Sequence, residues 1–187
     1  MENIYFDLKK LKYLGEGAII GKTVRIRKPE LCIIGDGTII DDFTYISCAL
    51  ETGRNCHIAS NVTLSGGSAK LIIGDHTGIG ASSTVHCESS DFTKVELDMP
   101  SAPDGMDEDR QKIRDVRMGS LILVGAHCCV LPGANLPHGT AFGSYSLIKN
   151  IKYEPWTLYA GNPKIKSLGL RDNSKIINTK YYKELIW

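Results

Sequence analysis

Large apolar residues recur at every sixth position along most of this chain. Neither a helix, with 3.6 residues per turn, nor a plain strand, with a period of two, produces this spacing. Thr52 is the one polar residue in the first run. The repeat occupies three runs: Ile34, Ile40, Ile46, Ile58 and Leu64; then Ile73, Ile79 and Val85; then Met118, Val124, Val130, Leu136, Phe142 and Ile148. Short strands must therefore alternate with turns that return each large side chain to one interior line.

A smaller or β-branched residue follows four positions after most of these large residues. These smaller residues are Thr38, Thr44, Cys56, Val62, Thr77, Ser83, Cys128, Ala134, Thr140 and Ser146. Two inward residues of unequal size in every six would fill a narrow triangular prism whose coils stack at about 4.8 Å. The pattern predicts an all-β fold, a coil of parallel strands. A β-sandwich fits less well, because its turns recur at roughly 8–12 residues and not at a fixed six.

Length and charge are consistent with one soluble domain. A chain of 187 residues can bury a sizeable core. A formal charge of +1 gives no case for nucleic acid, and no apolar run approaches the ~20 residues that insertion into a membrane requires. Residues 1–14 lack a long apolar stretch and a cleavage site, so we expect a capping helix there and not a signal peptide.

The six cysteines do not look like a secreted disulfide framework. Cys56 and Cys128 fall on the small inward position of the repeat, and Cys128 is adjacent to Cys129. We expect six reduced thiols in a cytoplasmic protein, with the buried ones acting as small apolar residues. The chain has no CxxC motif and no Cys/His spacing for zinc, so no metal site is predicted.

The repeat breaks at three places. It slips by two residues around Pro29 and by three within residues 65–69, and both slips predict bulged corners. The third break runs from His86 to Arg117, and a loop of about thirty residues in a compact domain usually has a function. Between residues 86 and 115 there are nine acidic and four basic residues, whereas residues 149–187 contain eight basic and three acidic ones. This contrast suggests proton chemistry at the loop and an anionic ligand near the tail.

Several segments together resemble the hexapeptide-repeat acetyltransferases. They are Gly35-Asp36-Gly37, the six-residue repeat, the interrupting loop, VGAHCCVLPGA at residues 124–134 and YAGNPK at residues 159–164. The resemblance covers roughly residues 15–170 and implies a left-handed parallel β-helix with a long inserted loop and short terminal helices. It also implies a homotrimer with active sites between subunits. We expect a β-helix domain at residues 1–150, with an N-terminal cap and an active-site loop at 86–117, followed by a coenzyme-binding segment and tail at 151–187.

The start of the loop narrows the resemblance to the branch that acts on sugars of surface polysaccharides. Ser89-Ser90-Asp91-Phe92, with the later Pro100 and Pro103, resembles the active-site loop of that branch. The resemblance implies direct transfer of acetyl from acetyl-CoA to a sugar hydroxyl in lipopolysaccharide, O-antigen or capsule biosynthesis. One alternative is N-acetylation of a nucleotide-linked amino sugar. A remote alternative is a zinc carbonic anhydrase-like β-helix or a scaffold, which is disfavoured because the five histidines do not share one register of the repeat.

The catalytic base is expected among three residues. A hydroxyl acceptor needs a base to take its proton, and many relatives use a His in the loop after the strand that ends here at Val85. In this chain His86 lies one residue after Val85, and the usual position is occupied by residues 88–90. The candidate set is therefore His86, Glu88 and Asp91. His86 is the base if the turn directs it into the cleft, and otherwise Asp91 is the base or the orienting residue.

The resemblance also implies the residues that bind the coenzyme. For the pantetheine arm they are Gly125, Ala126, Gly143, Ser144, Ala160, Gly161 and Pro163. Small residues at β-helix corners also have a purely structural explanation, which accounts for Gly125 and Gly143 nearly as well. Relatives carry a Lys two residues after the Pro, where this chain has Ile165, so Lys164 or Lys166, with Lys149 or Arg171, is expected at the phosphates. Asn61 and Ser90 are expected to contact the acceptor sugar.

Overall fold

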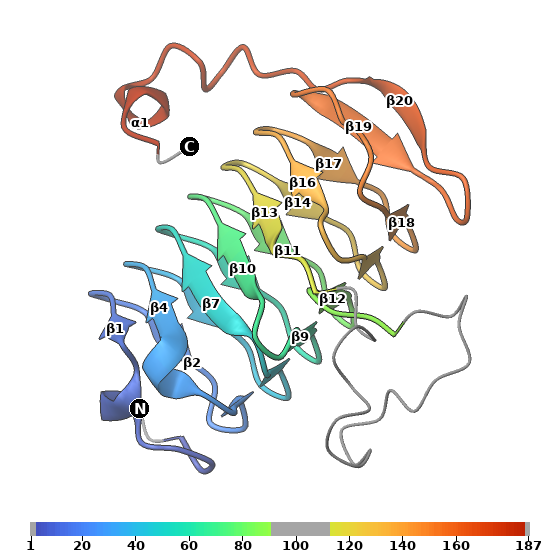
Figure 1. The fold of residues 1–187 in the computed structure, drawn as a ribbon. Coiled ribbons are helices and arrows are strands. Elements are labelled where there is room, and N and C mark those ends of the chain that lie inside the picture. Colours follow the sequence, from blue (N-terminus) through green and yellow to red (C-terminus); the bar gives the residue numbers. More distant parts are fainter. Residues whose placement is uncertain (1–2, 91–112, 186–187) are drawn as a thin grey trace.

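The computed structural model describes residues 3–90 and 113–185, and it shows a column of short strands in three sheets (Figure 1). Successive strands along the chain belong to successive sheets, and strands one coil apart pair in parallel. The predicted left-handed parallel β-helix is confirmed. A triangular coil of this kind follows from the six-residue repeat, because each short strand that carries a residue of the repeat directs that side chain into the interior.

The strands of the three sheets are as follows. Sheet A contains β1 (Tyr13–Leu14), β4 (Cys32–Ile34), β7 (Ala49–Thr52), β10 (Lys70–Ile73), β13 (Val116–Met118) and β16 (Asn135–Leu136). Sheet B contains β2 (Ile19–Ile20), β5 (Ile39–Ile40), β8 (His57–Ile58), β11 (Gly78–Ile79), β14 (Leu123–Val124), β17 (Ala141–Phe142), β19 (Thr157–Ala160) and the antiparallel β20 (Lys166–Leu170). Sheet C contains β3 (Arg25–Ile26), β6 (Tyr45–Ile46), β9 (Thr63–Ser65), β12 (Thr84–His86), β15 (Cys129–Val130) and β18 (Leu147–Ile148).

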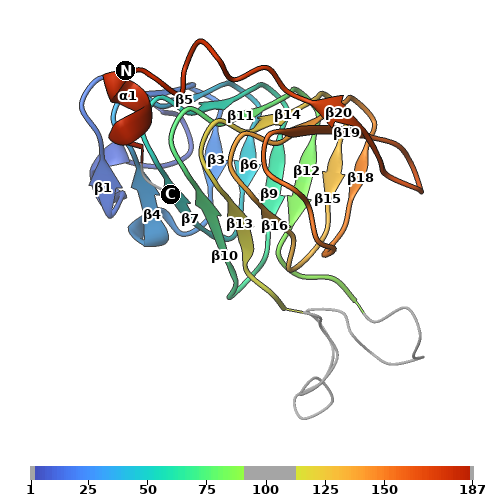
Figure 2. The same ribbon diagram turned by 90° about the horizontal axis from the view of Figure 1, so that it is seen from above.

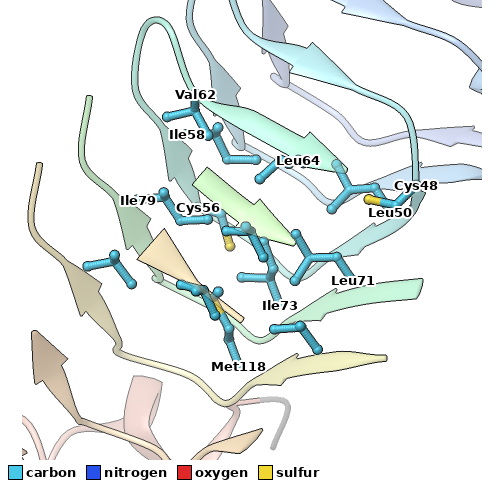
Figure 3. Packing of buried hydrophobic residues seen from close by; sticks show 14 of the residues in the cluster. Cys48, Leu50, Cys56, Ile58, Val62, Leu64, Leu71, Ile73, Ile79 and Met118 are labelled. Carbon is cyan, nitrogen blue, oxygen red and sulfur yellow. The ribbon is translucent and has the colours of Figure 1, made fainter. Parts of the chain in front are cut away.

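The large residues of the repeat form one continuous core (Figure 3). Ile34, Ile58 and Leu64 have no exposed surface. Thr52, the polar exception, is also buried, and its hydroxyl accepts a hydrogen bond from the Gly35 N–H at 3.0 Å. The exception therefore keeps its inward position, because a backbone donor of the neighbouring coil satisfies its oxygen.

The smaller inward residues bond to the backbone of the next coil. The Thr38 hydroxyl donates to the Gly53 carbonyl at 3.0 Å. The Cys56 and Cys128 thiols donate to the carbonyls of Gly74 and Gly143, at 3.1 and 3.2 Å. Thr, Ser and Cys suit this position because each is small and carries a donor for a carbonyl at the corner. All six cysteines are free thiols, as expected.

Extra residues are accommodated at the corner between sheets C and A. The slip around Pro29 forms a 3₁₀ helix, η2 (Pro29–Leu31), between β3 and β4. The slip within residues 65–69 lies between β9 and β10, where Gly66 is required because a Cβ there would lie 2.5 Å from the Cys87 Cβ. The chain leaves the column after β12 and rejoins it at β13, at this same corner (Figure 2). Both predicted bulges and the two points where the loop joins the column therefore lie along one edge of the column.

Both ends of the chain carry a short helix. The short capping helix predicted within residues 1–14 is a single 3₁₀ turn in the part that is described. That part contains one 3₁₀ turn, η1 (Leu8–Lys10), which the Asp7 carboxylate caps, and strand β1. The predicted C-terminal helix is present as α1 (Lys180–Lys183), and the tail that carries it lies along the corner between sheets A and B (Figure 1).

Two absences apply to residues 3–90 and 113–185. Within these ranges no helix has the length and apolar character needed to cross a membrane. The same residues contain no group of three His, Cys, Asp or Glu side chains arranged to hold a metal ion.

Candidate active site

His86 is the last residue of β12 in sheet C, at the point where the chain leaves the column. In β12 the half-buried Thr84 and His86 alternate with the buried Val85, so both face outward. The parallel neighbours place Thr63 and Ser65 of β9 on one side and Cys129 of β15 on the other. The imidazole is thus held on a rigid sheet at the base of the acidic loop, and not on the loop itself.

The environment of His86 favours a neutral imidazole. Its Nδ1 atom lies 2.9 Å from the Ser65 hydroxyl oxygen. Burial lowers the pKa of His86 below its ordinary value, and the nearby negative charge of Glu88 partly offsets this. A neutral imidazole has one nitrogen that can accept a proton, and the direction of the hydrogen bond with Ser65 decides which nitrogen that is. The role of His86 as general base stays a prediction.

The other candidates for proton chemistry begin at the same place. Glu88 is half-buried, and its carboxylate lies over the bulged corner at Gly67, where a Cβ would come within 2.4 Å of Oε2. Ser90 is half-buried, and its carbonyl accepts a hydrogen bond from the Ser89 hydroxyl at 3.2 Å. Asp91 lies outside the described residues. The structure thus brings His86, Glu88 and Ser90 together at one end of sheet C.

Most of the expected coenzyme residues form a line at the corner between sheets B and C. Gly125-Ala126 lies between β14 and β15, Gly143-Ser144 lies between β17 and β18, and Ala160-Gly161 spans the end of β19. The coils stack directly: a Cβ on Gly125 would lie 2.6 Å from the Ser144 nitrogen, and one on Gly143 would lie 3.1 Å from the Ala160 Cβ. This stacking accounts for the two glycines without a ligand. Ser144 is exposed beside them.

The basic candidates do not cluster. Lys149 follows β18 and lies at the sheet C to sheet A corner, across sheet C from the line of small residues. Pro163, Lys164 and Lys166 are exposed near the hairpin of β19 and β20, and Lys166 pairs with Ala160 at the end of that line. The hairpin lysines are therefore the better placed for a ligand that follows the line.

Arg171 was expected as a possible phosphate ligand, and the structure gives it another role. One guanidinium nitrogen donates to the carbonyls of Leu121, Gly139 and Thr140 at 3.0, 2.5 and 3.2 Å. Burial lowers the pKa of Arg171. The side chain anchors the tail to the corner between sheets A and B.

Asn61 lies at the sheet B to sheet C corner and not beside His86. Its backbone has φ of 59°, and its side-chain amide donates to the Ser82 hydroxyl at 3.1 Å. Asn adopts this left-handed conformation more readily than most residues, so the turn explains its presence. Its contact with an acceptor sugar stays a prediction.

Sequence reasoning missed a basic and aromatic strip on the outer face of sheet C. Arg25 and Tyr45 are paired neighbours in β3 and β6, and the Arg25 guanidinium lies 5.9 Å from the centre of the Tyr45 ring. Thr63 and Thr84 continue the same outward row toward His86. Only the register of neighbouring coils places these side chains in one row, and the sequence does not show that register directly.

Solved structures share this fold along almost the whole chain. A variant of AntD, an N-acyltransferase from Bacillus cereus in complex with dTDP-4-amino-4,6-dideoxyglucose and coenzyme A, matches with a TM-score of 0.81 and 22% identity, covering 98% of this chain and 99% of AntD. A hexapeptide-repeat acetyltransferase from Vibrio cholerae matches with a TM-score of 0.57 and 17% identity, over 88% of this chain and 77% of that one. A maltose O-acetyltransferase from Clostridium difficile matches with a TM-score of 0.51 and 14% identity, over 88% and 73%.

At these identities the likeness shows the fold, which is the fold predicted from the six-residue repeat. No family model matches the sequence, and no curated protein matches it.

Proposed function

We propose that this protein is an acyl-CoA-dependent acyltransferase that acylates the amine of a nucleotide-linked amino sugar directly. The observation that carries acyl transfer is the position of His86, a half-buried imidazole of lowered pKa that faces outward where the acidic loop begins, and it is compatible with an amine or a hydroxyl acceptor. The likeness of 98% of this chain to AntD, which was solved with a nucleotide-linked amino sugar and coenzyme A, supports the amine.

In the proposed reaction the acceptor nitrogen attacks the thioester carbonyl carbon. A C–N bond forms, the C–S bond breaks, and the amine proton passes to His86 Nε2. The same proton then leaves with the sulfur of coenzyme A as the free thiol. Glu88 and Asp91 are proposed to act on the charge and orientation of His86, and Ser90 and Asn61 are proposed acceptor contacts.

The coenzyme is proposed to lie along the corner between sheets B and C, with its pantetheine arm over Gly125, Ala126, Gly143, Ser144, Ala160, Gly161 and Pro163. Lys164 and Lys166, at the hairpin end of that line, are proposed to meet the phosphates. At this corner Gly80 stacks on Gly125 and Ala126. His86 follows Gly80 by six residues in the sequence, a span of at most roughly 20 Å at 3.3 Å per residue. An extended arm that turns across sheet C spans this interval. Lys149, on the His86 side, is a weaker candidate for a phosphate.

The acceptor is proposed to occupy the opposite half of sheet C. Thr63 and Thr84 offer hydroxyls beside His86, and Arg25 over Tyr45 offers a cation and a ring further along the row. Hydroxyls suit a sugar ring, and an arginine beside an aromatic ring suits a nucleoside diphosphate.

A homotrimer is proposed because a single column leaves apolar surface exposed. On the outer face of sheet B, Ile19 and Leu123 are 43% and 51% exposed. On sheet A, Ile33 and Ile72 line a groove of about 360 Å³. A second copy of the chain would cover such surface, and light scattering of the purified protein would give the number of subunits.

O-acetylation of a sugar hydroxyl is the second candidate. A neutral His86 favours it, because a hydroxyl depends on a base more than a neutral amine does. The fold is also shared with a maltose O-acetyltransferase.

One assay tests both candidates. Release of free thiol is followed with two acyl donors, acetyl-CoA and 3-hydroxybutyryl-CoA, of which the second was solved in complex with AntD. Each donor is tested with nucleotide-linked amino sugars, nucleotide-linked sugars and free sugars as acceptors. Turnover confined to amino sugars supports N-acylation, and turnover with acceptors that lack an amine supports O-acylation. No thiol release above the rate without enzyme, with every acceptor, would refute the acyltransferase proposal.

A further inference from the structure

Ser65, on the neighbouring coil, contacts His86 through its side chain and the following residue, Cys87, through its backbone. The two residues are paired in the parallel ladder of β9 and β12. The Ser65 hydroxyl oxygen lies 2.9 Å from His86 Nδ1, and the Ser65 carbonyl accepts a hydrogen bond from the Cys87 N–H at 2.7 Å. The serine is thus fixed relative to the strand that carries the imidazole.

The direction of the hydrogen bond decides what His86 can do. If Nδ1–H donates to the Ser65 oxygen, Nε2 has a free lone pair and can accept a proton. If the Ser65 hydroxyl donates to Nδ1, Nε2 carries the hydrogen and cannot serve as the base. A hydroxyl can take either role, because its hydrogen rotates about the C–O bond. Only the first arrangement is compatible with the proposed reaction.

We infer that Ser65 is a positioning residue: its hydroxyl accepts the Nδ1–H of His86 and so directs the Nε2 lone pair toward the acceptor. This inference rests on the proposed function of the same site. The inference gives a role to Ser65, which lies outside the loop, on strand β9, two residues after the proposed acceptor contact Thr63.

The charged groups around His86 leave this role to Ser65. On the adjoining strands Ser65 of β9 is the partner of His86, and the uncharged Thr63 of β9 and the thiol of Cys129 of β15 are the partners of Thr84, two residues before it. Glu88 acts on His86 through its charge. Where the chain rejoins the column, the Asp115 carboxylate accepts from the Lys70 N–H at 2.9 Å and pairs with Arg117 at 3.3 Å. Among the described residues, the imidazole is thus hydrogen-bonded to a hydroxyl and not to a carboxylate.

The test compares Ser65→Ala with Ser65→Thr, which keeps the hydroxyl and suits a strand. Ser68→Ala, at the exposed part of the same corner, is the matched control. A general base contributes roughly 10²–10⁴-fold, and misorienting it without removing it should cost part of that. We therefore expect kcat to fall about 10-fold in Ser65→Ala, with KM little changed. Ser65→Thr should keep most of the wild-type kcat, and Ser68→Ala should not change kcat or KM.

A second readout does not depend on activity. The ¹⁵N shifts of the His86 ring, assigned by comparison with His86→Gln, report which nitrogen carries the hydrogen. We expect the Nδ1–H form in the wild type and in Ser65→Thr, and a shift toward the Nε2–H form in Ser65→Ala.

An Nε2–H form in the wild type, or identical ring spectra in Ser65→Ala and wild type, would overturn the role of Ser65. If instead the ring spectra respond as expected and no acceptor is acylated, the proposed function fails while the Ser65–His86 relationship stands. The two failures are therefore distinguishable.

Discussion

Arg54 and Asp75 form an ion pair that closes the corner between sheets A and B and also holds the C-terminal tail. The Asp75 carboxylate is fully buried, and it accepts hydrogen bonds from the Arg54 backbone N–H at 2.6 Å and from its guanidinium at 2.7 and 3.1 Å. The same guanidinium donates to the Glu184 carbonyl at 2.6 Å. Charge pairing with Asp75 raises the pKa of Arg54. One buried carboxylate therefore links two coils and the tail.

Replacing Asp75 should destabilise the whole column. Asp75→Asn keeps the shape but leaves the arginine without its counter-charge, and breaking a buried pair typically costs 3–5 kcal/mol. The Arg54 side chain is 38% exposed, so we expect a loss of about 3 kcal/mol, at the lower end of that range. Urea unfolding monitored by circular dichroism measures it. Glu154→Gln breaks the exposed Lys152–Glu154 pair and should leave the midpoint unchanged; an equal loss in both variants would contradict a special role for Asp75.

Activity should depend on a neutral His86. Because its pKa is lowered from the ordinary 6.5, the group is largely unprotonated at neutral pH, and activity should be lost as pH falls through that lowered pKa. His86→Ala should reduce kcat by about 10²-fold or more.

In Glu88→Gln the carboxylate that raises the pKa of His86 is gone, so the acid limb of the kcat/KM profile should move to lower pH. The acceptor amine titrates identically in the wild type and in Glu88→Gln. An acid limb at the same pH in both enzymes would therefore show that His86 does not cause the loss of activity at low pH.

Adding bulk at the corner between sheets B and C should obstruct the coenzyme. Ser144 is exposed beside the line of small residues, so Ser144→Leu adds volume without disturbing the core. We expect KM for acetyl-CoA to rise about 10-fold, equivalent to 1.4 kcal/mol, with the unfolding midpoint unchanged. Ser60→Leu is the matched control, since Ser60 is also exposed and lies at the same corner further along the column. Equal increases in both variants would place the coenzyme elsewhere.

The hairpin lysines should act on the phosphates alone. Lys164→Ala combined with Lys166→Ala removes two exposed cations at the end of the line. KM should rise for acetyl-CoA and stay constant for acetyl-pantetheine, which lacks the phosphates, and the difference should shrink at high salt. Lys149→Ala, across sheet C, provides the comparison. If it alone raised KM for acetyl-CoA, the phosphates would lie on the His86 side.

The architecture was predictable because the repeat is strictly local. Each large residue such as Ile58 is followed by its own turn, and inward or outward position is set within six residues. Even the polar exception Thr52 stays inward, because Gly35 of the preceding coil supplies a donor. The N-terminal helix is limited to Leu8–Lys10 because the residues that follow pair with the first coils: Tyr13 pairs with Ile33 as a strand.

The candidate site was predictable only in part, because its neighbours come from different coils. Three regular six-residue steps would place partners 18 residues apart, yet Ser65 and His86 are 21 apart, owing to the slip of three at the bulged corner. Lys149 is close in sequence to Gly143, but the two residues lie at opposite ends of strand β18: Gly143 at the corner between sheets B and C, and Lys149 at the corner between sheets C and A. Arg171 looked like a phosphate ligand until the tail placed it among carbonyls.

The sequence by itself determined the period of the coil, the inward side chains and the place where the loop interrupts them, since each of these depends on contacts within one turn. The tertiary structure decided which residues of successive coils meet at the end of sheet C and which cations remain exposed. These contacts depend on the cumulative length of every corner and on where the tail docks, and no local pattern encodes either.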